Sequence, residues 1–178
     1  MQTDQAPSAQ PQCPPVVKST TVSLTPHQAF EFFTGRPLRW WPDRHRLVAG
    51  ERTRMVIEPA VGGRWYEEDR DGAQAQWGTV LVWEPPGRLA LTWRISGRWQ
   101  PLPDDAGASE IEVGFTPAQD GASTLVTVAH TRLERYGADA AGMRAALDAP
   151  GLGETLSAFA AAVAKAAPDT PSGSGANA

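Results

Sequence analysis

The chain has 178 residues, 41% of them hydrophobic, which is enough for one domain with a core of its own. Its formal net charge of -4 argues against a nucleic-acid or anionic-membrane surface, because either would need a basic patch. The single cysteine, Cys13, excludes an intramolecular disulfide and favours a reducing, cytoplasmic setting.

Both ends of the chain are rich in polar residues and proline. We therefore expect residues 1–15 and 168–178 to be disordered tails, and residues 16–167 to form one folded domain. The first residues lack the basic start and apolar stretch of a signal peptide. The longest fully apolar run, Ala158–Ala164, is too short to span a bilayer, so we expect no integral membrane association.

The folded part begins with signals for a strand and then a helix. The β-branched run Val16–Leu24 predicts a strand. Thr25 and Pro26 suit the N-cap and the first position of a helix, which we expect to continue to Thr34 and to end at Gly35. Pro37–Trp41 is expected to add one more helical turn.

Short runs of apolar residues separated by turn signals predict about six further strands. These are Met55–Ile57, Arg64–Glu68, Gln76–Trp83, Leu89–Ile95, Glu110–Thr116 and Ser123–Thr131. Strict alternation places Leu91 and Trp93 on one face of their strand, together with Leu89 and Ile95. For Gln76–Trp83 the pattern leaves open whether the valines or Leu81 and Trp83 face inward. Gly97–Ser109 is expected to be a polar loop.

The end of the chain is predicted to be helical. Asp139–Leu147 is expected to form a short helix that Pro150-Gly151 interrupts. From Leu152 the apolar residues recur at helical spacing and form one stripe, made of Leu152, Leu156, Phe159 and Val163. Strands followed by a helix predict an α+β fold, in which a curved antiparallel sheet wraps around the long C-terminal helix.

Several motifs between about residues 16 and 166 resemble those of one known superfamily. They are Thr25-Pro26-x-x-Ala29-Phe30, Leu38-x-Trp40-Trp41, Val61-Gly62-Gly63-x-Trp65, Trp77-Gly78-x-Val80-x-x-Trp83-Glu84-Pro85-Pro86-x-Arg88-Leu89, Thr92-Trp93 and Val126-x-Val128-x-His130. On these residues the chain is similar to the START-like (SRPBCC, helix-grip) superfamily, in particular to the branch named after the activator of the heat-shock 90 ATPase.

The resemblance implies a β-α-α-β6-α helix-grip fold with an elongated apolar cavity between the sheet and the last helix. Members of the superfamily bind lipids, polyketides or other hydrophobic molecules, and some catalyse cyclisation or dehydration in the cavity. Their last helix commonly opens with Gly-Trp, whereas this chain has Gly151-Leu152-Gly153. We therefore expect that end of the cavity to have a different shape.

Large aromatic residues are the main candidates for the cavity wall, although in this fold core filling and ligand contact are alternatives for each of them. The candidate ligand-binding residues are Trp40, Trp41, Trp65, Trp77, Trp93, Phe115, His130, Leu156 and Phe159. His130 is the polar member of this set. It shares strand parity with Val126 and Val128, and it is expected either to orient a ligand or to bond to the backbone at the strand end.

No catalytic motif and no metal or cofactor site is expected. Asp43-x-His45 lacks the further ligands that a metal site needs. The acidic run Glu67, Glu68 and Asp69 is expected to be solvated, and Arg64, Arg88 and Arg94 are expected to pair with surface carboxylates.

Three hypotheses about function follow. The first is the binding of a small hydrophobic or amphipathic ligand in the cavity. The second is a polyketide cyclase or dehydratase that uses the same cavity, with His130 as acid or base. The third is a stress-response protein that interacts with a chaperone. The expected partner is a small hydrophobic ligand rather than nucleic acid, and the chain is expected to be a monomer or a homodimer.

Overall fold

The computed structural model describes residues 13–166, so the two expected tails lie outside the described residues except for residues 13–15. The strands are β1 (Val16–Val22), β2 (Arg52–Ile57), β3 (Arg64–Asp69), β4 (Gln74–Glu84), β5 (Arg88–Trp93), β6 (Ser109–Pro117) and β7 (Thr124–Thr131). The α-helices are α1 (Pro26–Gly35), α2 (Ala140–Ala146) and α3 (Leu152–Ala166). Short irregular helical turns lie at Pro37–Arg39, Leu133–Asp139 and Leu147–Gly151.

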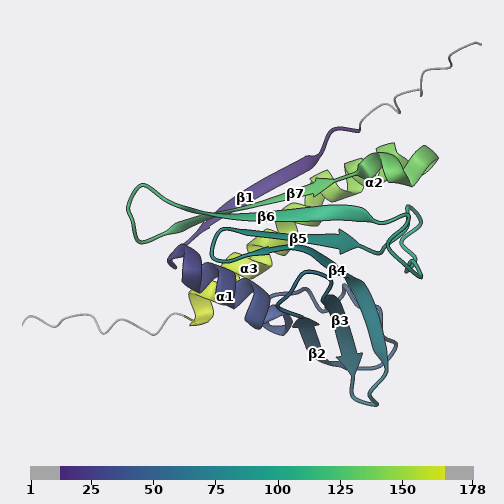
Figure 1. Cartoon of the computed structure of the whole chain (residues 1–178), viewed down its shortest axis with the longest axis horizontal. Coiled ribbons are helices and arrows are strands. Elements are labelled where there is room, and N and C mark those ends of the chain that lie inside the picture. Colours follow the sequence, from purple (N-terminus) through teal and green to yellow (C-terminus); the bar gives the residue numbers. More distant parts are fainter. Residues whose placement is uncertain (1–12, 167–178) are drawn as a thin grey trace, which may run out of the picture.

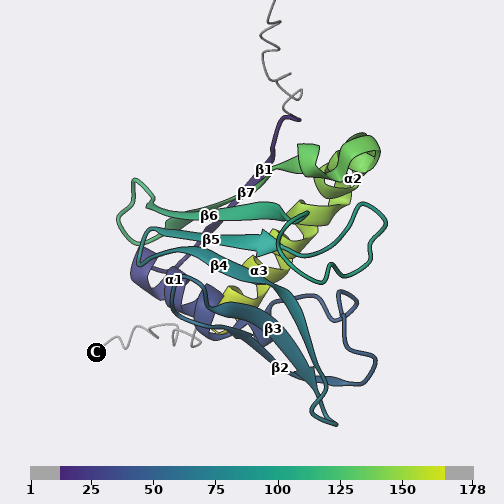
Figure 2. The ribbon, with the colours of Figure 1, turned by 45° about the vertical axis from the view of Figure 1, so that its right-hand side comes forward.

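The seven strands form one antiparallel sheet in the order β1-β7-β6-β5-β4-β3-β2. Helix α3 lies behind the sheet in Figure 1 and packs against β1. In the turned view of Figure 2, β2 and β3 bend away from β5, β6 and β7, so that the sheet curls around α3. The predicted α+β helix-grip architecture is confirmed.

Helix α1 begins where the sequence predicts. Thr25 accepts a hydrogen bond from Gln28 N (3.4 Å), and Gln28 Oε1 accepts one from Thr25 N (3.0 Å), which completes a capping box. The helix buries Phe30 and Phe33 against Phe115 of β6, with ring centroids 5.3 and 5.7 Å apart. These contacts fix α1 across one end of the sheet.

The predicted apolar stripe of the last helix is also confirmed. Leu152, Leu156, Phe159 and Val163 are the buried residues of α3. The interruption before α3 takes the form of an irregular turn at Leu147–Gly151, in which Ala149 leaves helical geometry. As a result, α2 and α3 are separate helices.

Strand β4 changes partners halfway along its length. Its first part pairs with β3 and its second part with β5, and the change occurs around Gly78. A Cβ atom at Gly78 would lie 1.9 Å from the carbonyl oxygen of Thr92. The sheet can therefore curl here only because residue 78 has no side chain.

Gly78→Ala is expected to lower the free energy of unfolding by about 3 kcal/mol or more, because the new methyl group meets backbone that cannot move aside. Gly114→Ala in β6 is the matched control, since a Cβ at that position meets no atom within 4 Å. Urea unfolding of both variants measures the difference. An equal, small loss in the two variants would contradict the role assigned to Gly78.

A bulge resolves the alternative that the sequence leaves open in β4. The pairing register with β5 shifts between Val80 and Val82, so the strand does not keep one alternation. Val80 is buried while Leu81 is exposed, and Trp83 is half-buried against Phe30, with centroids 5.2 Å apart. Thus neither of the two predicted faces holds along the whole strand.

The expected polar loop covers the outer face of β5. Asp105 accepts hydrogen bonds from Thr92 Oγ1 (2.6 Å), Thr79 Oγ1 (2.8 Å) and Arg94 Nε (2.7 Å). Arg94, assisted by the two hydroxyl groups, lowers the pKa of Asp105 to about 2. Consequently Thr92 is buried although it lies on the polar side of the alternation.

Candidate functional site: an aromatic pocket with a buried histidine

A pocket of about 280 Å³ lies between the curled sheet and α3. Its volume is close to the lower limit for small-ligand sites, which is about 300 Å³. Five parts of the chain line it, namely α1, residues 40–47, the inner face of the sheet, the loop after β5 at Trp99, and residues 147–156. The pocket is therefore formed at the place that the resemblance implies.

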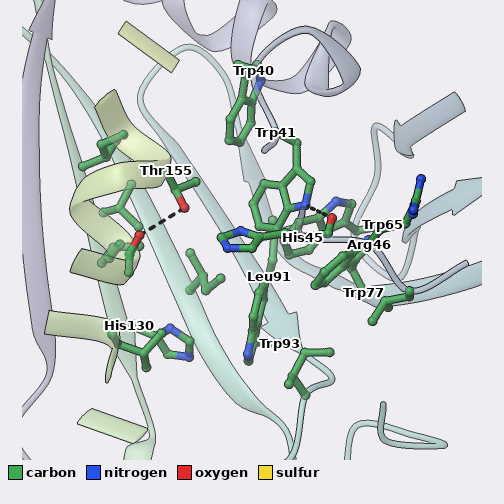
Figure 3. Close-up of a pocket in the computed structure, with 18 of the residues that line it drawn as sticks. Trp40, Trp41, His45, Arg46, Trp65, Trp77, Leu91, Trp93, His130 and Thr155 are labelled. Carbon is green, nitrogen blue, oxygen red and sulfur yellow. Dashed lines mark hydrogen bonds between the residues drawn. The ribbon is translucent and has the colours of Figure 1, made fainter. Parts of the chain in front are cut away.

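Four tryptophans form one continuous wall of the pocket (Figure 3). Trp41 contacts Trp65 (centroids 5.1 Å apart, perpendicular), Trp77 (5.2 Å) and Trp93 (6.0 Å). Trp65 and Trp77 stack at 5.8 Å with an angle of 24° between their planes. Because each ring is held by the others, the wall presents a large and rigid aromatic surface.

The indole N–H groups of this wall differ in their hydrogen bonds. Trp41 Nε1 donates to the carbonyl oxygen of His45 (3.0 Å), and Trp77 Nε1 donates to Glu67 Oε2 (3.1 Å). Trp65 Nε1 and Trp93 Nε1 are buried without an acceptor among residues 13–166. Unsatisfied buried donors are rare in native proteins, because each one lowers the stability of the fold. Both of these donors belong to residues that line the pocket.

Glu67 corrects the expectation that the acidic run is solvated, because it is completely buried. Its Oε1 accepts hydrogen bonds from Leu47 N and from Val48 N (2.8 Å). Its Oε2 accepts one from Arg52 Nη1 (3.2 Å). Strand alternation explains this burial, because Glu67 lies on the same inner face as Trp65.

Asp69 is buried for the same reason, and it accepts hydrogen bonds from Asp71 N (3.0 Å) and Ala73 N (2.9 Å) in the hairpin turn. Of the acidic run, only Glu68 keeps partial contact with solvent. The predicted pairing of arginines is confirmed, since Arg64 pairs with Glu58 and Arg88 with Glu84 and Glu112. Arg94 pairs with Asp105.

Arg52 and Glu67 together hold the segment that forms the mouth of the pocket. The guanidinium of Arg52 donates to the carbonyl oxygens of His45 (2.7 Å), Trp41 (3.3 Å) and Pro42 (3.4 Å). The Arg52 side chain is only 2% exposed. A buried ion pair thus fixes residues 41–48 in place over the sheet.

His130 is the buried polar residue of the pocket, and it is 1% exposed. Its Nε2 lies 2.7 Å from Ser109 Oγ, which in turn lies 2.6 Å from Tyr136 Oη. The imidazole of His130 therefore bonds to a side chain, and not to the backbone at the strand end, which was the alternative expected from the sequence. Figure 3 shows the imidazole of His130 beside Trp93, and their ring centroids are 5.8 Å apart.

Burial determines the protonation of His130 and Tyr136, the two ends of this hydrogen-bonded series. It lowers the pKa of His130 to about 4, so the imidazole is neutral near pH 7. It also raises the pKa of Tyr136 to about 12, so the phenol keeps its proton. The hydroxyl of Ser109 can therefore donate to His130 while it accepts from Tyr136, or donate to Tyr136 while it accepts from His130.

The predicted site residues divide into two groups. Seven of them line the pocket: Trp40, Trp41, Trp65, Trp77, Trp93, His130 and Leu156. Phe115 and Phe159 do not line it, because they lie deeper, in an aromatic cluster around Phe33. Phe115 faces inward by strand alternation and Phe159 by helical spacing, but phenylalanines of α1 pack against both of them.

Sequence reasoning missed the polar residues around the pocket. Ser109 and Tyr136 come from β6 and from the turn after β7, and no motif links them to His130. Arg44, His45 and Arg46 also line the pocket, as do Gly151 and Leu152 at the start of α3. The two residues at the start of α3 lie where the family's Gly-Trp would stand.

Among residues 13–166, no group of three or more His, Cys, Asp or Glu residues is placed to hold a metal ion. Likewise, no helix in the described part of the chain has the length and apolar character needed to cross a bilayer.

Comparison with solved structures gives two relatives of particular interest. One is described as "An anthrahydroquino-Gama-pyrone synthase Txn09 complexed with SUM"; it is 50% identical, covers 85% of this chain and 97% of its own, and has a TM-score of 0.59. The other is the self-sacrificing resistance protein CalC from Micromonospora echinospora, which is 29% identical, covers 88% and 97% of the two chains, and has a TM-score of 0.58.

A third structure, the protein MLL2253 from Mesorhizobium loti, shows the shared fold alone at 18% identity, with coverage of 86% and 99% and a TM-score of 0.57. A search of the curated proteins gives no match to this chain. The family model of the Activator of Hsp90 ATPase homolog 1-like proteins matches residues 23–164. Together with the helix-grip fold, this match places the chain in the family of Activator of Hsp90 ATPase homolog 1-like proteins.

Proposed function

We propose that this protein binds a flat, polycyclic aromatic polyketide in the tryptophan-walled pocket and closes a pyrone ring on it. The observation that carries the proposal is the hydrogen-bonded series His130–Ser109–Tyr136, which reaches a largely apolar, tryptophan-walled pocket at His130. The 50% identity to an anthrahydroquino-Gama-pyrone synthase supports the class of substrate. This develops the second of the three hypotheses and includes the first, because binding precedes the reaction.

The walls of the pocket suit a flat aromatic ligand. Trp41, Trp65, Trp77 and Trp93 offer ring faces and edges at which a fused ring system can stack. Burial of apolar surface would contribute about 25 cal/mol per Å², from which the cost of association is subtracted. The rigid wall lowers that cost, because few side chains need to be ordered on binding.

The reaction follows from the chemistry of a pyrone. An aromatic hydroxyl group adds to the far carbonyl of a neighbouring 1,3-diketone, which forms a C–O bond, and the phenol proton ends on the former carbonyl oxygen. That hydroxyl group then leaves as water with a proton from the carbon between the two carbonyls. The net change is the loss of one water, without oxidation or reduction.

His130 is suited to carry both protons. When Nε2 donates to Ser109, and Ser109 to Tyr136, Nδ1 is free to accept the phenol proton and to return it to the oxygen. Nδ1 makes no hydrogen bond to residues 13–166 that would compete with a substrate. The same nitrogen then takes the carbon-bound proton and protonates the leaving hydroxyl group.

Sequestration of a hydrophobic compound without turnover is the second candidate function. The 29% identity to the resistance protein CalC favours it, and the same pocket would serve. A chaperone-binding role has less support, because the exposed large apolar residues of the described chain, such as Val17, Val61 and Trp99, lie on different elements.

The test is a cyclisation assay with an anthrahydroquinone or anthraquinone that carries a 1,3-diketone next to a ring hydroxyl. We expect saturable formation of the pyrone, seen as the loss of one water by mass spectrometry, well above the spontaneous rate. Stoichiometric binding without acceleration would instead support sequestration. If the compound neither binds nor reacts, both candidate functions are wrong.

A further inference from the structure

The mouth of the pocket carries positive charge in a chain whose formal net charge is -4. The lining includes the consecutive residues Arg44, His45 and Arg46, and no Asp or Glu from the described residues. The rest of the lining is apolar or aromatic apart from Gly151, Thr155 and His130. The charge of the mouth is therefore opposite to that of the molecule as a whole.

The two arginines differ in how they are paired. Arg44 forms an ion pair with Glu154 at the start of α3. Arg46 has no carboxylate within 4 Å and no side-chain hydrogen bond among residues 13–166, although it lines the pocket. The Arg46 guanidinium is thus available, with five N–H donors, to a group outside the chain.

The backbone on both sides of Arg46 is held in place. Before it, the carbonyl oxygen of His45 accepts from Trp41 Nε1 (3.0 Å) and from Arg52 Nη1 (2.7 Å). After it, the amides of Leu47 and Val48 donate to the buried Glu67. These anchors hold the backbone of Arg46 beside the pocket, while its side chain, which borders the pocket, is exposed to solvent.

The titration of His45 agrees with a positive potential at this point. Partial burial and the neighbouring charge of Arg44 lower the pKa of His45, with a further contribution from Arg52, while Glu154 opposes them. His45 is therefore neutral near pH 7, and the positive charge belongs to the arginines. In Figure 3, Arg46 and His130 lie on opposite sides of the pocket.

We propose that Arg46, with Arg44 beside it, binds a carboxylate of the ligand at the mouth of the pocket, while the fused rings lie among the tryptophans. This rests on the proposed function and deepens it, because it defines the substrate as an aromatic polyketide acid. It also sets the orientation of the substrate. The acid group stays at the mouth, and the end that closes its ring reaches His130.

The experiment compares two probes of nearly the same shape, anthraquinone-2-carboxylate and its methyl ester. Quenching of the intrinsic tryptophan fluorescence measures their affinities near pH 7. We expect the carboxylate to bind about tenfold more tightly than the ester, because a guanidinium–carboxylate pair is a charge-assisted and bidentate contact. Added salt should reduce this preference.

Arg46→Gln is expected to remove the preference for the carboxylate and to leave the affinity for the ester unchanged. Arg54→Gln is the matched control, because Arg54 is exposed on β2 and does not line the pocket, yet the substitution changes the net charge equally. Equal affinities of the two probes for the unaltered protein would overturn the inference alone, as would an equal effect of both substitutions. Failure of both probes to bind would overturn the proposed function as well.

Discussion

His130→Gln is expected to lower kcat/KM for ring closure by about 10²–10⁴-fold, which is the usual contribution of a positioned acid–base group. Glutamine is close to histidine in size, and its amide can keep a hydrogen bond to Ser109. It cannot exchange a proton with the substrate, however. We therefore expect the fold and the binding of the aromatic probe to persist while turnover is lost.

His27→Gln is the control for this substitution, because His27 is an exposed histidine on α1 that pairs with Glu31 and does not line the pocket. Its kcat/KM should equal that of the unaltered protein. If His130→Gln reacts as fast as the control variant, His130 is not the acid–base group. If it fails to bind the probe, the role of His130 is structural.

The dependence on pH provides an independent readout of the same residue. Burial lowers the pKa of His130 from 6.5 to about 4, and the active form is neutral. The value of kcat/KM reports ionisation of the free enzyme, so it should stay level as the pH falls through 6.5 and should decline only toward pH 4. A decline centred at pH 6.5 would place the essential group elsewhere.

Glu67→Ala should lower the free energy of unfolding by about 3–5 kcal/mol, because it leaves Arg52 buried without its inner carboxylate partner. It also removes the acceptor of Leu47 N, Val48 N and Trp77 Nε1. Each donor that is left unsatisfied in the interior costs about 1–3 kcal/mol unless water replaces the carboxylate. Chemical denaturation monitored by fluorescence measures the loss.

Glu68→Ala provides the comparison on the same strand. Glu68 keeps partial contact with solvent and bonds to Gln74 (2.7 Å), so its loss should cost less than about 1 kcal/mol. Equal effects of the two substitutions would show that Glu67 does not anchor residues 41–48. A destabilised Glu67→Ala protein should in addition lose the preference for the carboxylate probe, since Arg46 is then no longer held at the mouth.

Periodicity predicts most elements of this fold because it reflects local geometry. The stripe Leu152, Leu156, Phe159 and Val163 is predicted residue by residue, since every fourth or third side chain of a helix points the same way. The capping box at Thr25 and Gln28 is equally local. The inward side of β4 could not be predicted, because the bulge between Val80 and Val82 depends on pairing with β5.

The apolar part of the pocket was predictable from the sequence in the same way. Strand alternation places Trp93 on the inner face, and Trp65 and Trp77 are candidates for the wall as large aromatics whose facing the pattern leaves open; all three line the pocket. The same reasoning could not distinguish them from Phe115, which also faces inward. That distinction depends on α1, which covers Phe115 and leaves the tryptophans open to the pocket.

The polar part of the site depends on contacts between distant segments. Ser109 meets His130 and Tyr136 only because β6 pairs with β7 and the following turn folds back over β6. Alternation turns Glu67 inward, and its carboxylate can remain buried there only because Arg52 of the neighbouring strand and the amides of residues 47 and 48 bond to it. Composition and alternation thus determine the helix-grip fold and the aromatic character of its inner face, because buried apolar residues recur with the local period of a strand or helix. Which charged and hydrogen-bonding groups are buried at the site is decided by the tertiary structure. A buried polar atom needs a partner, and only folding brings a partner from a distant segment within reach.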